Sequence, residues 1–189
     1  MPDLQTVRNV ELLKVGRWAC SNGTFHFTAE DLAAAIEAHK AGVLRKPPLK
    51  MGHHDPRFDG GPALGYVDNL RLTDGGTTLV GDFVDVPKAI ATLLPRAWPD
   101  RSIEGMFEFE APDGTVHRFV LTSVALLGEV APAVRTLKSL RDVAAVASGR
   151  RVVVAASAFH PADLDAHRRR AVQIAAARRR RTQRTMLGV

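Results

Sequence analysis

Three adjacent residues that could do chemistry together, His53, His54 and Asp55, stand in the stretch KMGHHDP (50–56). Imidazole and carboxylate groups can bind a metal ion, and a histidine can also act as a general base toward a nucleophile. Neighbouring side chains on an extended segment point to opposite sides, so all three cannot reach one ion. We therefore expect no metal site, and we favour a general base over a plain surface turn.

A general base needs a nucleophile, and two side chains elsewhere in the chain are candidates. Ser102 follows a Pro-Asp-Arg break and opens an apolar stretch, so its hydroxyl would stand at the mouth of a strand. Gly105 would let another backbone approach that strand closely. Cys20 lies in the turn-like stretch ACSNGT, where a half-buried or surface thiol is the simpler interpretation. Spacing alone leaves Ser102 open to a second interpretation as a strand or helix cap.

Composition limits the class of protein. The chain has 189 residues, of which 46% are apolar, and this fraction is ordinary for a globular protein. Its single cysteine, Cys20, excludes an intramolecular disulfide and a multi-cysteine zinc site. There is no run of about 18 apolar residues and no apolar signal core near the start. We expect no membrane contact, no cofactor and a reducing compartment.

Charge is distributed unevenly along the chain. Residues 144–189 contain ten arginines and two aspartates, whereas residues 1–143 carry 16 basic and 18 acidic groups. This partition predicts one domain over 1–148 and an arginine-rich C-terminal arm over 149–189, either helical or disordered. The arginines between 150 and 184 could contact nucleic acid or another acidic surface, or they could simply cover a solvated helix face.

The elements that must position His53 and Ser102 are mainly strands. Alternating apolar residues and turn signals predict strand segments over 6–18 and 47–52, and hairpins over 63–85 and 102–127. Capping signals, proline positions and helix-forming residues predict helices over 28–42, 87–98 and 132–147. The pattern as a whole predicts an α+β domain dominated by strands, with about three helices.

Five short motifs follow one another in a distinctive order: LKMGHHDP, ALGYVDNLRL, LVGDFVDVP, RSIEGMFEF and LTSVALLGEVAPAV. Their order resembles that of the prohead, or capsid maturation, serine proteases of tailed bacteriophages, in the style of the Mu-like protease I type, and the resemblance covers roughly residues 6–142. No single motif is specific for that family, but the five in this order are. The resemblance implies a mixed and antiparallel β-barrel-like core with surrounding helices, similar to the fold of herpesvirus assemblin.

The same resemblance implies roles for individual residues. The Gly-His histidine of the family falls on His53, directly after Gly52, or on His54 if the alignment is shifted by one residue. The nucleophile of the family falls on Ser102. His53 would then take the Ser102 proton, the Ser102 oxygen would attack a peptide carbonyl, and backbone N–H groups would hold the oxyanion.

The sequence does not decide which acid would be the third member of such a site. Many relatives carry a glutamate in the strand before a Pro-Ala turn, where this chain has Thr122 and Ser123. The remaining candidates are Glu104, Asp55 and Glu129, each of which could equally be a solvated surface charge. A Ser-His pair without an acid could still act, because losing the orienting member usually costs less activity than losing the nucleophile or the base.

The resemblance implies a serine endopeptidase of a phage or prophage. Such an enzyme would cleave scaffold, capsid-protein extensions and possibly itself inside the assembling procapsid in the host cytoplasm. Its expected partners are the major capsid protein and the scaffold, and a homodimer is plausible because assemblins gain activity on dimerising. The alternative is a catalytically inactive scaffold or minor capsid assembly protein with a basic interaction tail. A nucleic-acid-binding protein that works through its arginines is a further rival.

Overall fold

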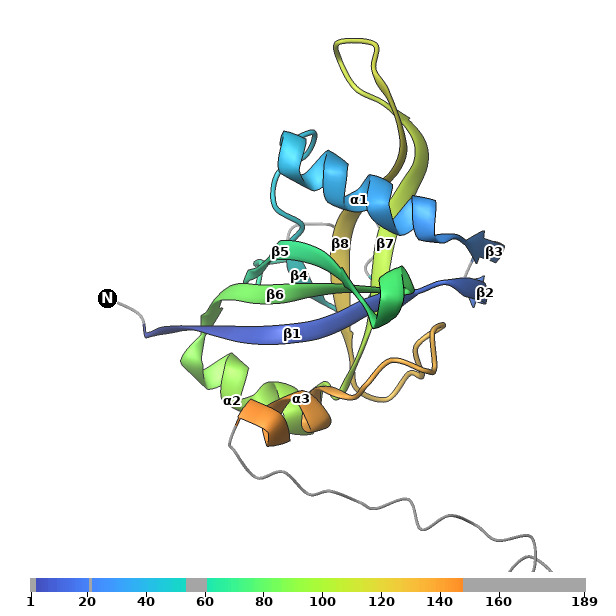
Figure 1. Cartoon of the computed structure of the whole chain (residues 1–189). Coiled ribbons are helices and arrows are strands. Elements are labelled where there is room, and N and C mark those ends of the chain that lie inside the picture. Colours follow the sequence, from blue (N-terminus) through green and yellow to red (C-terminus); the bar gives the residue numbers. More distant parts are fainter. Residues whose placement is uncertain (1–2, 21, 54–60, 148–189) are drawn as a thin grey trace, which may run out of the picture. The chain divides into compact units, whose positions relative to one another are not determined.

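The computed structural model describes residues 3–20, 22–53 and 61–147 (Figure 1). In these ranges the chain forms, in order, β1 (Leu4–Lys14), β2 (Gly16–Cys20), β3 (Gly23–Phe27), α1 (Ala29–Ala41), β4 (Leu49–Met51), β5 (Tyr66–Thr73), the 3-10 turn η2 (Asp74–Gly76), β6 (Thr78–Pro87), α2 (Lys88–Ala97), β7 (Asp100–Glu110), β8 (Val116–Leu127) and α3 (Leu140–Ala147).

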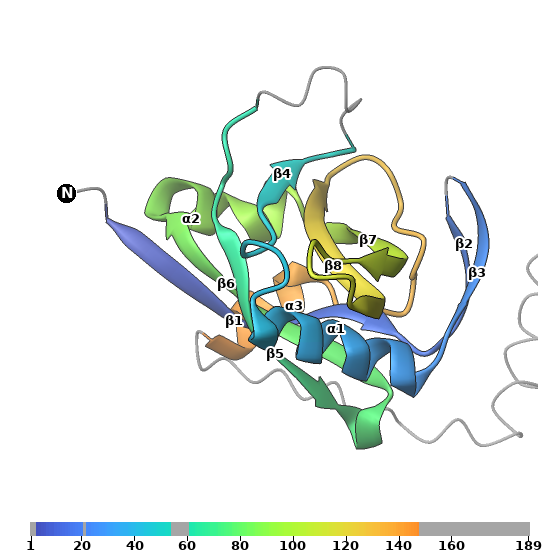
Figure 2. The ribbon, with the colours of Figure 1, turned by 90° about the horizontal axis from the view of Figure 1, so that it is seen from above.

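The strands of the described residues form two three-stranded sheets and one separate hairpin. In the first sheet β6 is central, and β1 and β5 pair antiparallel on its two sides. In the second sheet β8 is central, with β4 parallel on one side and β7 antiparallel on the other. β2 pairs only with β3, and this hairpin projects to one side of the two sheets in both views (Figures 1 and 2).

Helix α1 begins and ends as its sequence predicts. The Thr28 hydroxyl accepts a hydrogen bond from the Asp31 backbone N–H, and the Asp31 carboxylate accepts one from the Thr28 N–H, which completes a capping box. Gly42 ends the helix in the left-handed conformation. Arg118 of β8 donates to the same Asp31 carboxylate, so the first turn of α1 is tied to the second sheet.

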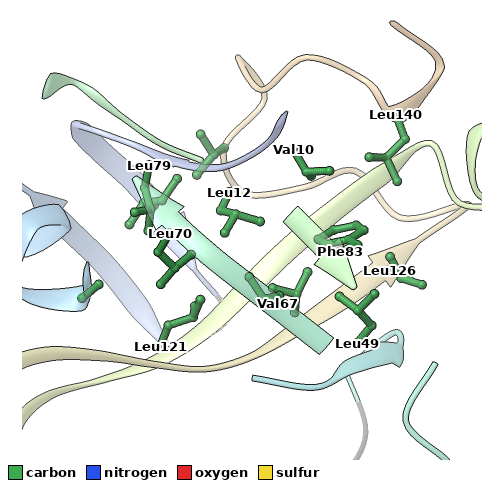
Figure 3. Packing of buried hydrophobic residues seen from close by; sticks show 14 of the residues in the cluster. Val10, Leu12, Leu49, Val67, Leu70, Leu79, Phe83, Leu121, Leu126 and Leu140 are labelled. Carbon is green, nitrogen blue, oxygen red and sulfur yellow. The ribbon is translucent and has the colours of Figure 1, made fainter. Parts of the chain in front are cut away.

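Both sheets contribute side chains to one core (Figure 3). The leucine, valine and phenylalanine side chains labelled there are at most 5% exposed, and burying each of them contributes roughly 1.5–3 kcal/mol. They come from β1, β4, β5, β6, β8 and α3: Val10, Leu12, Leu49, Val67, Leu70, Leu79, Phe83, Leu121, Leu126 and Leu140. The core therefore holds the second sheet, and with it β4 and β7, in a fixed relation to the first.

The hydrogen-bonded strands of the described residues do not close into a barrel. On one side the two sheets are joined, because Pro48, next to β4, forms an isolated bridge with Tyr66 of β5. On the other side no backbone ladder joins β7 to β1 within the described ranges, and the side chain of Arg101 spans the two strands, with Nε donating to Glu11 O at 2.6 Å. The structure confirms an α+β domain that consists mostly of sheets and contains few helices.

The predicted helix over 132–147 is wrong for its first half, because α3 begins only at Leu140. The backbone N–H of Lys138 donates to Glu11 Oε2 at 2.9 Å, and Lys138 O accepts from Arg101 Nη1 at 2.6 Å. These long-range hydrogen bonds use backbone groups that a helix would satisfy internally, so tertiary contacts override helix propensity. The two predicted hairpins are confirmed as β5–β6 and β7–β8, and α2 follows Pro87 as expected.

Two predictions from the sequence concern membrane-spanning helices and the C-terminal arm. None of the helices in the described ranges is long and apolar enough to cross a membrane. The predicted arm over 149–189 lies outside the described residues.

Candidate functional site

A tight turn at the end of β4 positions His53. Gly52 has a φ of +61°, in the left-handed region that favours glycine, and its N–H donates to Leu126 O of β8 at 3.0 Å. The turn thus ends β4 while staying attached to the neighbouring strand. The His53 side chain that follows is about half exposed. The glycine before the histidine therefore has a local structural reason, which is independent of any family resemblance.

Three strands converge on the carboxylate of Glu104. His53 Nδ1 lies 2.8 Å from Glu104 Oε1. On the other carboxylate oxygen, Ser123 Oγ of β8 donates to Oε2 at 2.7 Å, and Lys50 Nζ of β4 lies 2.8 Å away. The strand register explains why Ser123 reaches this carboxylate, because Glu104 on β7 lies directly opposite Ser123 on β8. Glu104 is therefore the acid that the structure places beside His53.

Glu104 is ionised in this environment. Burial raises the pKa of its carboxyl group, but the hydrogen bonds from Lys50, Ser123 and His53 and the positive charge of Lys50 lower the pKa by more, so the net result lies below the ordinary value. A carboxylate next to Nδ1 favours the histidine tautomer that carries its proton on Nδ1. In that tautomer the Nε2 atom of His53 carries no proton.

Ser102 lies on the same strand as Glu104, two residues earlier. Side chains two apart on a strand point to the same face of the sheet, and the register pairs Ser102 with Ala125, which in turn pairs with Lys50. Ser102, His53 and Glu104 all line one cavity of about 930 Å³. Within the described residues no hydrogen bond joins Ser102 to His53. The structure brings the predicted nucleophile, base and acid to one cavity, with only the base–acid contact formed.

The cavity lies where the strands fail to close a barrel. Its walls come from β1, the β2–β3 hairpin, β7 and the segment 130–137 that follows β8, which is orange in Figure 2. Phe25 and Phe107 are stacked with ring centroids 6.0 Å apart, and Phe119 lies 4.8 Å from Phe107. A Cβ atom at Gly105 would come within 2.5 Å of the Phe119 ring, so the glycine lets this aromatic cluster pack beside the strand. The walls of the cavity are thus largely apolar.

The other candidates from the sequence are not brought to this arrangement. Burial raises the pKa of the Cys20 thiol, which also contacts Trp18 O, so Cys20 lines the cavity as a neutral thiol. Glu129 is exposed and forms no ion pair with the described residues. His54 and Asp55 lie outside the described residues.

Two contacts of the candidate site were missed from the sequence, namely those of Lys50 and Ser123 with Glu104. A signal existed for Glu104 itself, because the Ser-x-Glu spacing on one strand places both side chains on one face. No comparable signal existed for Lys50 or Ser123, since both reach Glu104 only through pairing of distant strands.

No group of three or more His, Cys, Asp or Glu side chains within the described ranges is arranged to hold a metal ion. Comparison with known proteins finds no matching family model, no matching characterised protein and no matching solved structure.

Proposed function

We propose that this chain is a serine endopeptidase in which Ser102 is the nucleophile, His53 is the general base and Glu104 orients His53. The observation that carries the proposal is the 2.8 Å contact between His53 Nδ1 and Glu104 Oε1, in the cavity that Ser102 also lines. A base oriented by a third group and directed at a hydroxyl is the general arrangement of activated serine nucleophiles.

The spacing on β7 suits this mechanism. Two residues along a strand correspond to about 6.6 Å, which leaves room for an imidazole ring between the Ser102 and Glu104 side chains. His53 Nε2 would take the proton of Ser102 Oγ as that oxygen attacks a carbonyl carbon, and the resulting imidazolium would return the proton to the leaving amine. Water would then hydrolyse the acyl-enzyme by the same base catalysis. The present lack of a Ser102–His53 hydrogen bond is compatible with this role, because such contacts often tighten only when substrate binds.

The free edge of β7 supports a peptide substrate. β7 is an edge strand of its sheet in the described residues, and residues 102–105 and Phe107 line the cavity. An edge strand presents unpaired N–H and C=O groups that an extended peptide can pair with, while pockets beside it select side chains. The Phe25–Phe107 stack would offer such a pocket to an apolar side chain.

The biological setting of the proposal rests on the order of motifs. That order supports a phage or prophage maturation protease with an assemblin-like fold, acting inside the procapsid on scaffold and capsid-protein extensions. A homodimer and contacts of the arm with an acidic surface belong to the same proposal.

Self-cleavage in the purified chain provides a direct test of this proposal. Mass spectrometry should show time-dependent truncation of the wild-type protein, with VVVAASAF (152–159) as the expected region. Neither Ser102→Ala nor His53→Gln should be truncated, whereas Glu129→Gln should behave as wild type. In a phage that encodes the chain, Ser102→Ala should leave uncleaved precursors in the procapsid. If maturation proceeds unchanged with Ser102→Ala, the chain is an inactive scaffold or minor capsid component instead.

A further inference from the structure

The two oxygens of Glu104 have different partners. Among the described residues, Oε1 has His53 as its polar partner, whereas Oε2 is shared by the Ser123 hydroxyl at 2.7 Å and the Lys50 ammonium at 2.8 Å. The Lys50 side chain is only 15% exposed, so its charge is less screened than that of a surface lysine. An acid that only had to orient His53 would not need a cation on its far oxygen.

We propose that Lys50 and Ser123 are positioning residues of the Ser102 site with separable roles: Ser123 fixes the rotation of the Glu104 carboxylate, and Lys50 offsets its negative charge. This inference rests on the proposed function. Neither residue contacts substrate in this account, and both act on His53 through Glu104.

The role of Ser123 follows from geometry. A hydroxyl donor on Oε2 prevents the carboxylate from turning about its last bond, so Oε1 stays directed at His53 Nδ1. Ser123 is only 5% exposed and sits in the middle of β8, which makes its hydroxyl a rigid support. Removing the Ser123 hydroxyl should therefore let the Glu104 carboxylate rotate without changing the charge of the site.

The role of Lys50 follows from electrostatics. A carboxylate at Nδ1 stabilises the imidazolium form of His53, and a lysine on the same carboxylate works against that stabilisation. Lys50 therefore partly cancels the negative charge that Glu104 presents to His53 Nδ1.

Other charged or titratable groups also line the cavity that His53 faces. Arg101 of β7 is buried, and its Nε and Nη1 donate to backbone carbonyls of β1 and of the segment after β8. Arg135 is exposed on that same segment. Cys20 of β2 is held neutral because burial raises the pKa of its thiol. Among the lysines and arginines of the described residues, Lys50 is the one that directly contacts Glu104.

The test measures the His53 ring by NMR as a function of pH in the full chain, with His53→Gln to assign its signal. Lys50→Met should move the midpoint of the His53 titration to higher pH, and Glu104→Gln should move it to lower pH. Ser123→Ala should move it by less than half of the Lys50→Met shift. Lys50→Arg should restore the wild-type midpoint. Lys88→Met is the matched control, because it removes an exposed lysine at the start of α2, paired with Asp3.

Peptide hydrolysis separates the two roles further. Ser123→Ala should lower kcat by about tenfold at every pH, whereas Lys50→Met should shift the acidic limb of the kcat/KM profile to higher pH. Lys50→Gln replaces Lys50→Met if the latter does not fold. A midpoint that is unchanged or lowered in a folded Lys50 variant, or moved equally by Ser123→Ala, overturns the inference. If all the NMR shifts appear but wild type hydrolyses no peptide, the proposed function fails while the charge relation stands.

Discussion

At the scale of single residues, the site is organised around Glu104 rather than around the histidine pair. Its carboxylate contacts groups from β4, β8 and the turn after β4, so one side chain connects His53 to the sheet. Gly52 contributes at the same scale, because its positive φ turns the chain so that His53 follows β4 directly. The contact with Glu104 therefore orients the His53 side chain at the end of β4.

Replacing Glu104 should affect activity far more than stability. In Glu104→Gln the amide can present its NH₂ group to His53 Nδ1 and favour the wrong tautomer, so kcat/KM for peptide hydrolysis should fall by about 10³-fold. Glu129→Gln provides the matched control and should retain wild-type activity. Equal losses in the two variants would show that Glu104 does not orient the base.

At the scale of elements, Asp82 on the central strand β6 joins both neighbouring strands. Its carboxylate accepts from the Asn9 backbone N–H of β1 at 2.9 Å, from Asn69 Nδ2 of β5 at 2.9 Å and from Arg71 Nη2 at 3.0 Å. Asn9 and Asn69 both have positive φ and lie at irregularities in the strand pairing. Asp82 therefore connects both irregular positions to the central strand of the first sheet.

Removing that carboxylate should destabilise the first sheet in a pH-dependent way. Burial raises the pKa of Asp82, but its hydrogen bonds and Arg71 lower it by more, so the folded-state pKa lies below the ordinary value. The contribution of Asp82 is thus full above the ordinary carboxyl pKa and is lost as pH falls through the lower folded-state value. Asp82→Ala should cost roughly 2–4 kcal/mol of unfolding free energy at neutral pH, and less in acid.

Urea unfolding of Asp82→Ala at several pH values measures this effect. Asp85→Asn on the same strand is the control, because Asp85 also has a positive φ, which asparagine tolerates. A cost that is constant with pH would mean that the charge of Asp82 contributes nothing.

What the sequence could predict depended on the range of the interactions. The hairpins and α1 follow from turn residues and caps within a few positions, and they were predicted correctly. The conformation of the segment 132–139 was predicted wrongly, because it depends on Glu11 and Arg101, which are far away in the sequence. Glu104 could be proposed but not chosen over its rivals, because its partners Lys50 and Ser123 meet it only through strand register.

At the scale of the whole described domain, the opening between β1 and β7 has two features: a buried arginine that connects the two strands, and the cavity that Ser102 lines. Arg101 bridges it, and burial lowers the pKa of this guanidinium to about 10, with Nη2 unpaired among the described residues. The same opening contains the cavity that Ser102 lines. A closed barrel would have paired the edge of β7 that the proposed substrate needs.

The described domain should not need the arginine-rich arm to fold. All core residues of the described structure lie before residue 141, and blocks of three and four consecutive arginines are too costly to bury unpaired. We expect residues 1–148 alone to unfold cooperatively, with a Tm within a few degrees of that of the full chain in calorimetry. An unfolded fragment would place part of the arm in the core.

Covalent labelling tests whether His53 and Glu104 activate the Ser102 hydroxyl. A fluorophosphonate probe reacts with an activated serine through loss of fluoride, which leaves one phosphonyl group on Oγ. Intact-mass and peptide-mapping mass spectrometry should find one label per wild-type chain, on Ser102, and none in folded His53→Gln. The absence of any label in the folded wild-type protein, or a label on a serine other than Ser102, would show that Ser102 is not an activated nucleophile.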